Sequence, residues 1–145
     1  MTEDEINTLA ALADQIIPPS AKYGIPGAGD PAIVAEIQQD AARRMLCLAD
    51  AMQALDRLVE AGVGFTDLDA AARATTVTTF REIHATEANL IASLAAQCYY
   101  RDDRVMASLG MEDRAPHPEG YEVKQGDWSL LDPVRQRSSF YRSTE

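Results

Sequence analysis

The sequence predicts an all-α protein: a small bundle of about four main helices over residues 1–110, followed by an extended, irregular C-terminal tail over residues 111–145. Two observations lead to this division. Up to Gly110, apolar residues recur at helical intervals, and residues typical of helix starts and stops separate the runs. Beyond Gly110 neither the helical nor the strand period is sustained, and proline and glycine interrupt the chain repeatedly.

The first predicted helix covers about residues 3–17. Thr2 and Glu5 have the spacing of a capping box, in which each side chain accepts a hydrogen bond from the backbone of the other. Pro18 and Pro19 cannot continue a helix, and the glycine-rich stretch that follows indicates an irregular loop. The apolar residues that hold the helical spacing are Ile6, Leu9, Leu12, Ala13, Ile16 and Ile17.

The second predicted helix is the longest, at roughly 30 residues. Asp30 and Pro31 suit its N-cap and first turn, because proline supplies a helical φ where no amide donor is needed. Polar residues between Gln39 and Arg44 crowd the pattern and leave a kink or break open. The apolar stripe, which runs up to Gly62, consists of Ile33, Val34, Ile37, Ala41, Met45, Leu48, Met52, Leu55 and Val59.

Two further helices and a helical turn complete the predicted bundle. Thr66 is a candidate cap for a helix ending near Ile83, and Thr86 for a helix ending near Tyr99. A short helix is expected to begin at Asp102 or Asp103 and to end at Gly110.

Composition narrows the classes of function. The 145 residues include 13 Lys plus Arg against 23 Asp plus Glu, a formal net charge of −10. Such an acidic chain opposes the phosphate-neutralising surface that nucleic-acid binding needs, so no nucleic acid is expected among its partners. No apolar run approaches the roughly 18 to 20 residues of a membrane-spanning helix, so no membrane insertion is expected. The first residues are acidic and show no export signal, which favours a cytoplasmic location.

The two cysteines, Cys47 and Cys98, allow at most one disulfide bridge. We expect a pair of reduced, buried thiols, with a bridge between two packed helices as the alternative. Neither cysteine has a histidine or basic residue near it in its helical pattern, so neither is expected to be catalytic.

A search for catalytic and metal-binding motifs gives a negative result. His84 and His117 are the only histidines and have no companion at metal-ligand spacing. Three glycines between residues 24 and 29 lack the Lys-Ser/Thr ending of a phosphate-binding loop. We expect no catalytic, metal or cofactor-binding residues in this chain; His84 suits a helix end and His117 a loop.

The residues after Gly110 are too apolar and aromatic for a tail that is simply solvated. Arginine outnumbers lysine by 11 to 2, and arginines and aromatic residues together are enriched at binding hot spots. The tail is therefore predicted to bind a partner, and a tail that seals its own core is the alternative. The predicted partner-binding residues are Tyr121, Trp128, Arg135, Arg137, Phe140, Tyr141 and Arg142.

Three segments carry a resemblance to a known family. The first is LADQIIP at residues 12–18 with PGAGD at 26–30; the second is YYRDDRV at 99–105 with Leu109-Gly110; the third is PEGY at 118–121, continuing to Val134-Arg135 and Tyr141-Arg142. In this order and spacing they resemble the small, or gamma, subunit of gluconate 2-dehydrogenase, also called subunit 3. The resemblance spans most of the chain.

This resemblance implies a non-catalytic accessory subunit. Its partner would be a large FAD-dependent dehydrogenase or oxidase of the glucose-methanol-choline type that oxidises sugars, sugar acids or glycosides. The FAD would belong to the partner, and this chain would hold no cofactor and not be an enzyme by itself. Many family members carry a twin-arginine export signal, which this sequence does not show, so a cytoplasmic complex is expected and a periplasmic one is the alternative.

A second function class stays open beside the resemblance. A small helical enzyme or ligand-binding protein could use a pocket between helices, with His84, Cys98 or Tyr99 near its mouth.

Overall fold

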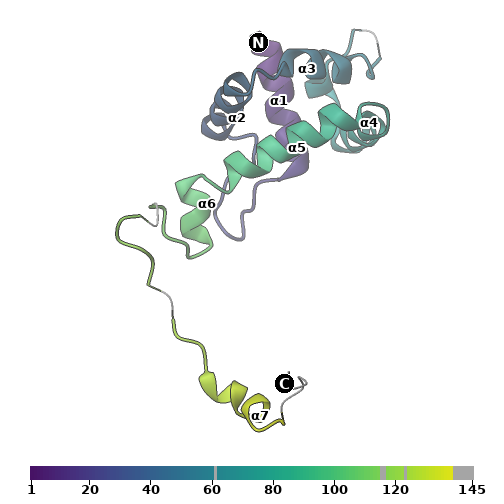
Figure 1. Cartoon of the computed structure of the whole chain (residues 1–145). Coiled ribbons are helices and arrows are strands. Elements are labelled where there is room, and N and C mark those ends of the chain that lie inside the picture. Colours follow the sequence, from purple (N-terminus) through teal and green to yellow (C-terminus); the bar gives the residue numbers. More distant parts are fainter. Residues whose placement is uncertain (61, 115–116, 123, 139–145) are drawn as a thin grey trace, which may run out of the picture. The chain divides into compact units, whose positions relative to one another are not determined.

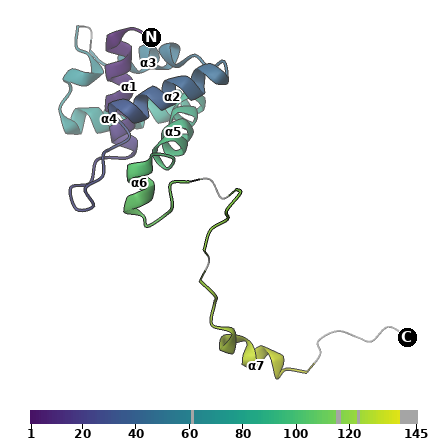
Figure 2. The ribbon, with the colours of Figure 1, turned by 90° about the vertical axis from the view of Figure 1, so that its left-hand side faces the viewer.

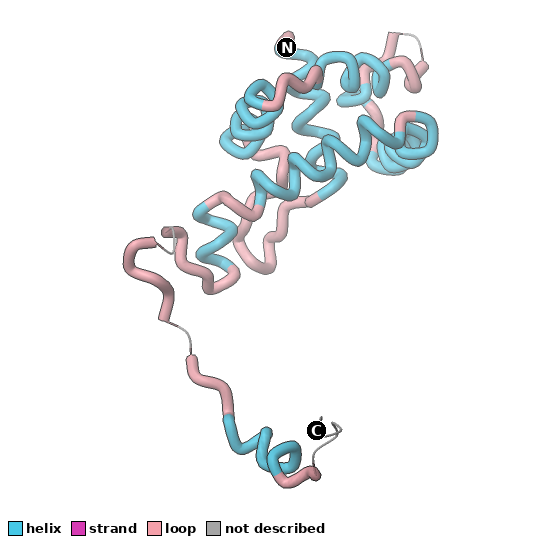
Figure 3. Tube along the Cα trace, viewed as in Figure 1, coloured by secondary structure: helices cyan, strands magenta, loops and turns pink. Residues whose placement is uncertain are grey.

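The computed structural model describes residues 1–60, 62–114, 117–122 and 124–138, and divides the chain into two units, Met1–Asp113 and Arg114–Glu145. Every regular element among these residues is helical, as predicted, apart from one isolated antiparallel bridge between Ser20 and Ile25 (Figures 1 and 3). Unit 1 contains α1 (Glu3–Ile16), α2 (Pro31–Arg43), α3 (Leu48–Asp56), η1 (Phe65–Asp67), α4 (Ala70–Ile83), α5 (Ala85–Tyr99) and α6 (Asp103–Ser108).

The first two helices begin as the sequence predicts. The Glu5 amide donates to Thr2 Oγ1 at 3.2 Å and the Thr2 amide donates to Glu5 Oε2 at 2.8 Å, which completes the capping box of α1. At α2, the Ala32 amide donates to Asp30 Oδ1 at 3.0 Å, with Pro31 in the first turn.

The predicted long helix is two helices, α2 and α3, so the break that the sequence left open between Gln39 and Arg44 is present at the end of that stretch and just beyond it. Met45 has a φ of 55°, in the left-handed region, and its side chain is 93% exposed rather than part of the apolar stripe. The Leu46 amide donates to Ala41 O at 2.9 Å and the Met45 amide to Ala42 O at 3.1 Å. This is the Schellman arrangement that ends helices, with methionine in the place where glycine is usual. The absence of glycine there explains why the sequence did not mark the exact position of the break.

The caps of α4 and α5 also differ from prediction. Asp69, not Thr66, caps α4 by accepting the Ala72 amide at 2.8 Å, because Thr66 is already part of η1. Helix α5 begins at Ala85, before the predicted cap Thr86. Asp102 caps α6 by accepting the Arg104 amide at 3.0 Å, as expected.

The core of unit 1 lies where α5 packs against α1, α2 and α4 (Figures 1 and 2). The apolar stripe of α2 and α3 is buried there, except for Met45 and the half-buried Val59. The largest fully buried side chains are Phe65, Phe80, Leu9, Ile33, Ile37, Met52, Leu55, Ile91, Leu94 and Val105.

Unit 2 contains two short helices that the sequence did not predict, η2 (Trp128–Leu131) and α7 (Asp132–Arg135). Asp127 starts η2 by accepting the Ser129 amide at 3.0 Å. None of the described residues of unit 2 is buried.

Nowhere in the described residues is a helix both long enough and apolar enough to span a lipid bilayer.

Candidate functional site

Arg104 joins two segments that are far apart in the sequence, the end of the glycine-rich loop and the start of α6. Its Nη1 and Nη2 donate to the two carboxylate oxygens of Asp30 at 3.1 and 2.9 Å. Its Nε and Nη2 donate to those of Asp102 at 2.9 and 2.8 Å. Asp30 and Asp102 are also the N-caps of α2 and α6, so one guanidinium holds two helix starts together.

The contact with Arg104 changes the pKa values of both the Asp30 and the Asp102 carboxylate. The hydrogen bonds from Arg104 lower the pKa of Asp30 and the pKa of Asp102 below their ordinary values, and partial burial opposes the shift in each case. Both groups therefore stay ionised, and the clasp of Asp30, Arg104 and Asp102 stays closed, at neutral pH.

The glycine-rich loop is bound to α1 by its own backbone. The Gly29 amide donates to Asp14 Oδ1 at 2.8 Å. A Cβ at Gly27 would collide with the Asp14 carboxylate, and a Cβ at Gly29 would collide with the carbonyl oxygen of Ala10. Gly27 and Gly29 of the PGAGD motif are thus required for close packing of the loop on α1.

Beside the clasp lies an apolar hollow of about 340 Å³, which we call the groove. The end of α1, the loop after it, the end of α5 and α6 all contribute to it. Tyr23, Tyr100 and Leu109 stand exposed there, and the rings of Tyr99 and Tyr100 pack edge to face with centroids 5.2 Å apart. The groove is lined by Ile17, Tyr23, Ile25, Tyr99, Tyr100, Val105, Ser108 and Leu109.

The groove and the clasp bring together the first two segments that carry the family resemblance. Residues 12–30 supply Ile17 and Asp30, and residues 99–110 supply Tyr100, Arg104 and Leu109. Of the groove residues, sequence reasoning named only Tyr99, as a residue near the mouth of an interhelical pocket, because nothing in the spacing of two separate motifs shows that they meet in space.

The second exposed apolar surface is in unit 2, on η2 and α7. Trp128 is 61% exposed and its Nε1 donates to Gln125 Oε1 at 3.3 Å. Arg135 pairs with Asp132 at 3.3 Å one turn away. We call this surface the helical anchor; its exposed apolar residues are Trp128, Leu130, Leu131 and Val134.

The predicted partner-binding residues fall into three groups. Trp128 and Arg135 lie together in the helical anchor, and Arg137 is exposed two residues beyond it. Tyr121 lies apart in the same unit, where its hydroxyl donates to the carbonyl oxygen of Arg114 and its ring lies 5.3 Å from the Arg114 guanidinium. Phe140, Tyr141 and Arg142 lie outside the described residues.

The cysteines correct two expectations. Both are free, but Cys47 is exposed and only Cys98 is buried. Burial raises the pKa of the Cys98 thiol, and the positive charge of Arg101 opposes that shift. Arg101 Nη2 lies 3.5 Å from Cys98 Sγ, so a basic residue does lie near this thiol, three positions along the chain.

Arg101 also belongs to an ionic network that sequence reasoning missed. Asp40 is buried, and its carboxylate oxygens lie 3.0 Å from Arg43, 3.2 Å from Arg44 and 3.5 Å from Arg101. The first two contacts have the i,i+3 and i,i+4 spacing of helix neighbours, a signal that the sequence does contain. The third ties the end of α2 to the end of α5.

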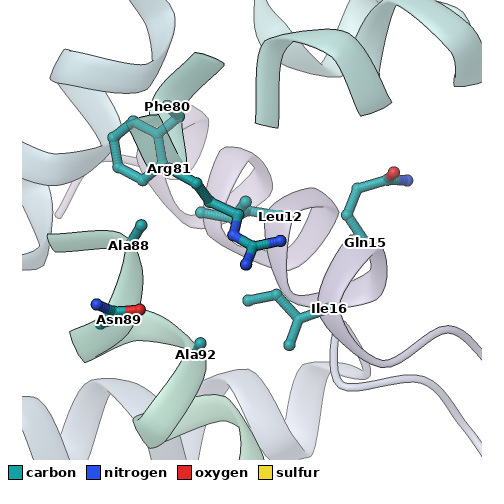
Figure 4. Close-up of a pocket in the computed structure, with 8 residues that line it drawn as sticks. All are labelled: Leu12, Gln15, Ile16, Phe80, Arg81, Ala88, Asn89 and Ala92. Carbon is teal, nitrogen blue, oxygen red and sulfur yellow. The ribbon is translucent and has the colours of Figure 1, made fainter. Parts of the chain in front are cut away.

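A separate cavity of about 320 Å³ opens between α1, α4 and α5 (Figure 4). Like the interhelical site considered from sequence, it lies between helices, but none of His84, Cys98 and Tyr99 lines it. Of these three residues only Tyr99 lines a described hollow, and that hollow is the groove. The residues that line the cavity are Leu12, Gln15, Ile16, Phe80, Arg81, Ala88, Asn89 and Ala92.

No group of three or more His, Cys, Asp or Glu side chains among the described residues is placed to hold a metal ion. Comparison of the chain with protein-family models, with curated proteins and with solved structures finds no match.

Proposed function

We propose that this protein is the non-catalytic small subunit of a heteromeric FAD-dependent dehydrogenase or oxidase of the glucose-methanol-choline type. In this proposal it binds and stabilises the large flavoprotein subunit in the cytoplasm. The FAD and the oxidation of a sugar, sugar acid or glycoside belong to that partner.

The meeting of the two resemblance segments at one place carries the proposal. Residues 12–18 with 26–30, and residues 99–105 with 109–110, resemble the small subunit of gluconate 2-dehydrogenase, and they contribute to the groove and the clasp. Tyr23, Tyr100 and Leu109 give this location three large exposed side chains, which suits a protein interface better than a solvated surface. The clasp pre-organises the surface, because Arg104 fixes the start of α6 beside the loop that follows α1.

The helical anchor supports the proposal independently. Four apolar side chains stand exposed on eight successive residues, Trp128–Arg135, and the flanking Arg135 and Arg137 add cationic groups. Tryptophan and arginine are the residue types most enriched at binding hot spots. An obligate interface commonly buries upwards of about 2,000 Å² in total, so a stable complex needs extensive contact with the partner. The groove and the anchor are therefore both assigned to the partner.

The proposal is tested by capture of the partner. The full chain, tagged and expressed in its source cells, is expected to co-purify with a much larger protein that carries FAD absorbance and oxidises a sugar or sugar acid. Mass spectrometry identifies that protein and its stoichiometry. A variant with Trp128→Ala and Leu109→Asp is the matched control and is expected to lose the flavoprotein. Capture of no flavoprotein by the intact chain would refute the proposal.

A further inference from the structure

The cavity between α1, α4 and α5 has the chemistry of a small-molecule site. Its floor is apolar, formed by Leu12, Ile16 and Phe80 together with the small side chains of Ala88 and Ala92. Its volume of about 320 Å³ falls at the lower end of the range for ligand sites.

Three polar side chains stand around this floor, one from each helix: Gln15 of α1, Arg81 of α4 and Asn89 of α5. Figure 4 shows the Arg81 guanidinium reaching from α4 toward Leu12 and Ile16 of α1, over the apolar floor. Carboxamides and a guanidinium offer several N–H donors and one fixed positive charge. The cavity contains no acidic lining residue.

Arg81 forms no ion pair with the described residues, although the chain carries ten more negative than positive charges. Arg44 and Arg104 have the carboxylate partners Asp40 and Asp30, whereas Arg73 donates to backbone carbonyl oxygens. Arg57, like Arg81, has no ion pair with the described residues. Glu82 is next to Arg81 in the sequence but does not line this cavity. Arg81 is an exposed side chain that lines the cavity beside its apolar floor, and with Asn89 and Glu82 it also lines a neighbouring hollow.

We propose that this cavity binds a small apolar monocarboxylate, a medium-chain fatty acid. The hydrocarbon chain lies on Leu12, Ile16 and Phe80, and the carboxylate accepts hydrogen bonds from the Arg81 guanidinium and the Asn89 amide. A closed apolar cavity of about 150 Å³ is enough for benzene, so about twice that volume suits a chain of about eight carbons. The inference does not depend on the partner, because all of its residues belong to α1, α4 and α5.

Octanoate is the probe, titrated calorimetrically into the full chain at neutral pH. One saturable site per chain is expected. The Arg81→Gln variant is expected to bind octanoate at least tenfold more weakly. Arg57→Gln is the matched control, because it removes the same charge from an exposed arginine that does not line the cavity, and its affinity should be unchanged.

Two further measurements distinguish recognition of the carboxylate from non-specific binding of the hydrocarbon chain. 1-Octanol, which has the same chain without the charge, should bind at least tenfold more weakly than octanoate. Asn89→Asp places a negative charge beside Arg81 on an exposed position that tolerates polar residues, and it should weaken octanoate binding by a similar factor. Circular dichroism confirms that each variant is folded. No saturable binding at millimolar octanoate, or equal affinity of octanoate for wild type and Arg81→Gln, would overturn the proposal.

Discussion

The two units of this chain treat their apolar residues in opposite ways. In unit 1, twenty-one apolar side chains are buried, and the helices are arranged around them. In unit 2 the described residues include none that is buried, yet Trp128, Leu130, Leu131 and Val134 are all large and apolar. Burial explains why the residues of unit 1 are apolar, and it does not explain those of unit 2. Hydrophobicity therefore folds unit 1, whereas the exposed apolar residues of unit 2, like Tyr23, Tyr100 and Leu109 of the groove in unit 1, are proposed to serve association.

The largest expected effect comes from a pair of identical substitutions, one in each unit. Leu55 is 0% exposed, so Leu55→Ala should lower the free energy of unfolding by about 2–5 kcal/mol. Leu130 is 74% exposed, so Leu130→Ala should change it by less than about 0.5 kcal/mol. Urea denaturation followed by circular dichroism measures both. Equal destabilisation by the two substitutions would contradict the assignment of Leu55 to the folding core and of Leu130 to an exposed surface.

The next largest effect concerns partner affinity rather than stability. Trp128→Ala should weaken binding of the flavoprotein by about 2 kcal/mol or more if its indole is buried at the interface, about a 30-fold change in Kd. The melting temperature should stay unchanged, because the side chain is exposed in the isolated chain. Met45→Ala is the control, since Met45 is more exposed than Trp128 and belongs to neither surface. An unaltered Kd of Trp128→Ala for the flavoprotein would show that Trp128 of the helical anchor does not contact the partner.

A smaller effect is expected at the clasp, and it depends on pH. Arg104 is half-exposed and screened by water, so Arg104→Gln should cost about 1 kcal/mol of unfolding free energy at pH 7. Asp30 and Asp102 have lowered pKa values when folded, so their stabilisation is complete above the pKa of the unfolded carboxyls, at about 4. It is lost as the pH falls through the folded pKa values. Wild type and variant should therefore converge in acid, and a difference that grows below pH 4 would contradict this assignment.

The smallest expected effect is a gain in the free energy of unfolding. Met45 holds a left-handed φ at the end of α2, which costs a non-glycine residue free energy. Met45→Gly relieves that cost but adds freedom to the unfolded chain, so a net stabilisation of about 0.5–1 kcal/mol is expected. Thermal melts measure it, with Met45→Ala as the reference that keeps a Cβ. Greater stability of the alanine variant would show that the backbone there is not strained.

Local signals in the sequence predicted the helices well, because caps and apolar spacing act over a few residues. The capping box of Thr2 and Glu5, and the start of α2 at Asp30, are confirmed as read. The sequence left a break open between Gln39 and Arg44 but did not place it at Met45, because a methionine occupies the usual glycine position. Asp69 caps α4 in place of the predicted Thr66, because Thr66 belongs to η1. The two short helices of unit 2 are one turn each, too short to produce a period.

The candidate site was harder to predict because it depends on contacts between distant segments. Arg104 and Asp30 are 74 positions apart, and only the fold places them at 2.9 Å. Asp40 illustrates the same limit: its pairs with Arg43 and Arg44 follow from helix spacing, but its contact with Arg101 does not. Sequence reasoning did identify Trp128 and Arg135 from composition alone, and their role stays a prediction.

Unit 1 is expected to be the stable body of the protein, and unit 2 is proposed to supply much of the partner contact in addition to the groove of unit 1. The most direct test of this division is a chain ending at Asp113, compared with the full chain in both a thermal melt and a titration against the flavoprotein. We expect a helical, soluble fragment whose melting temperature lies within a few degrees of that of the full chain. Its Kd for the flavoprotein should be at least 30-fold weaker. A fragment that melts much earlier, or one that binds the flavoprotein with unchanged affinity, would contradict it.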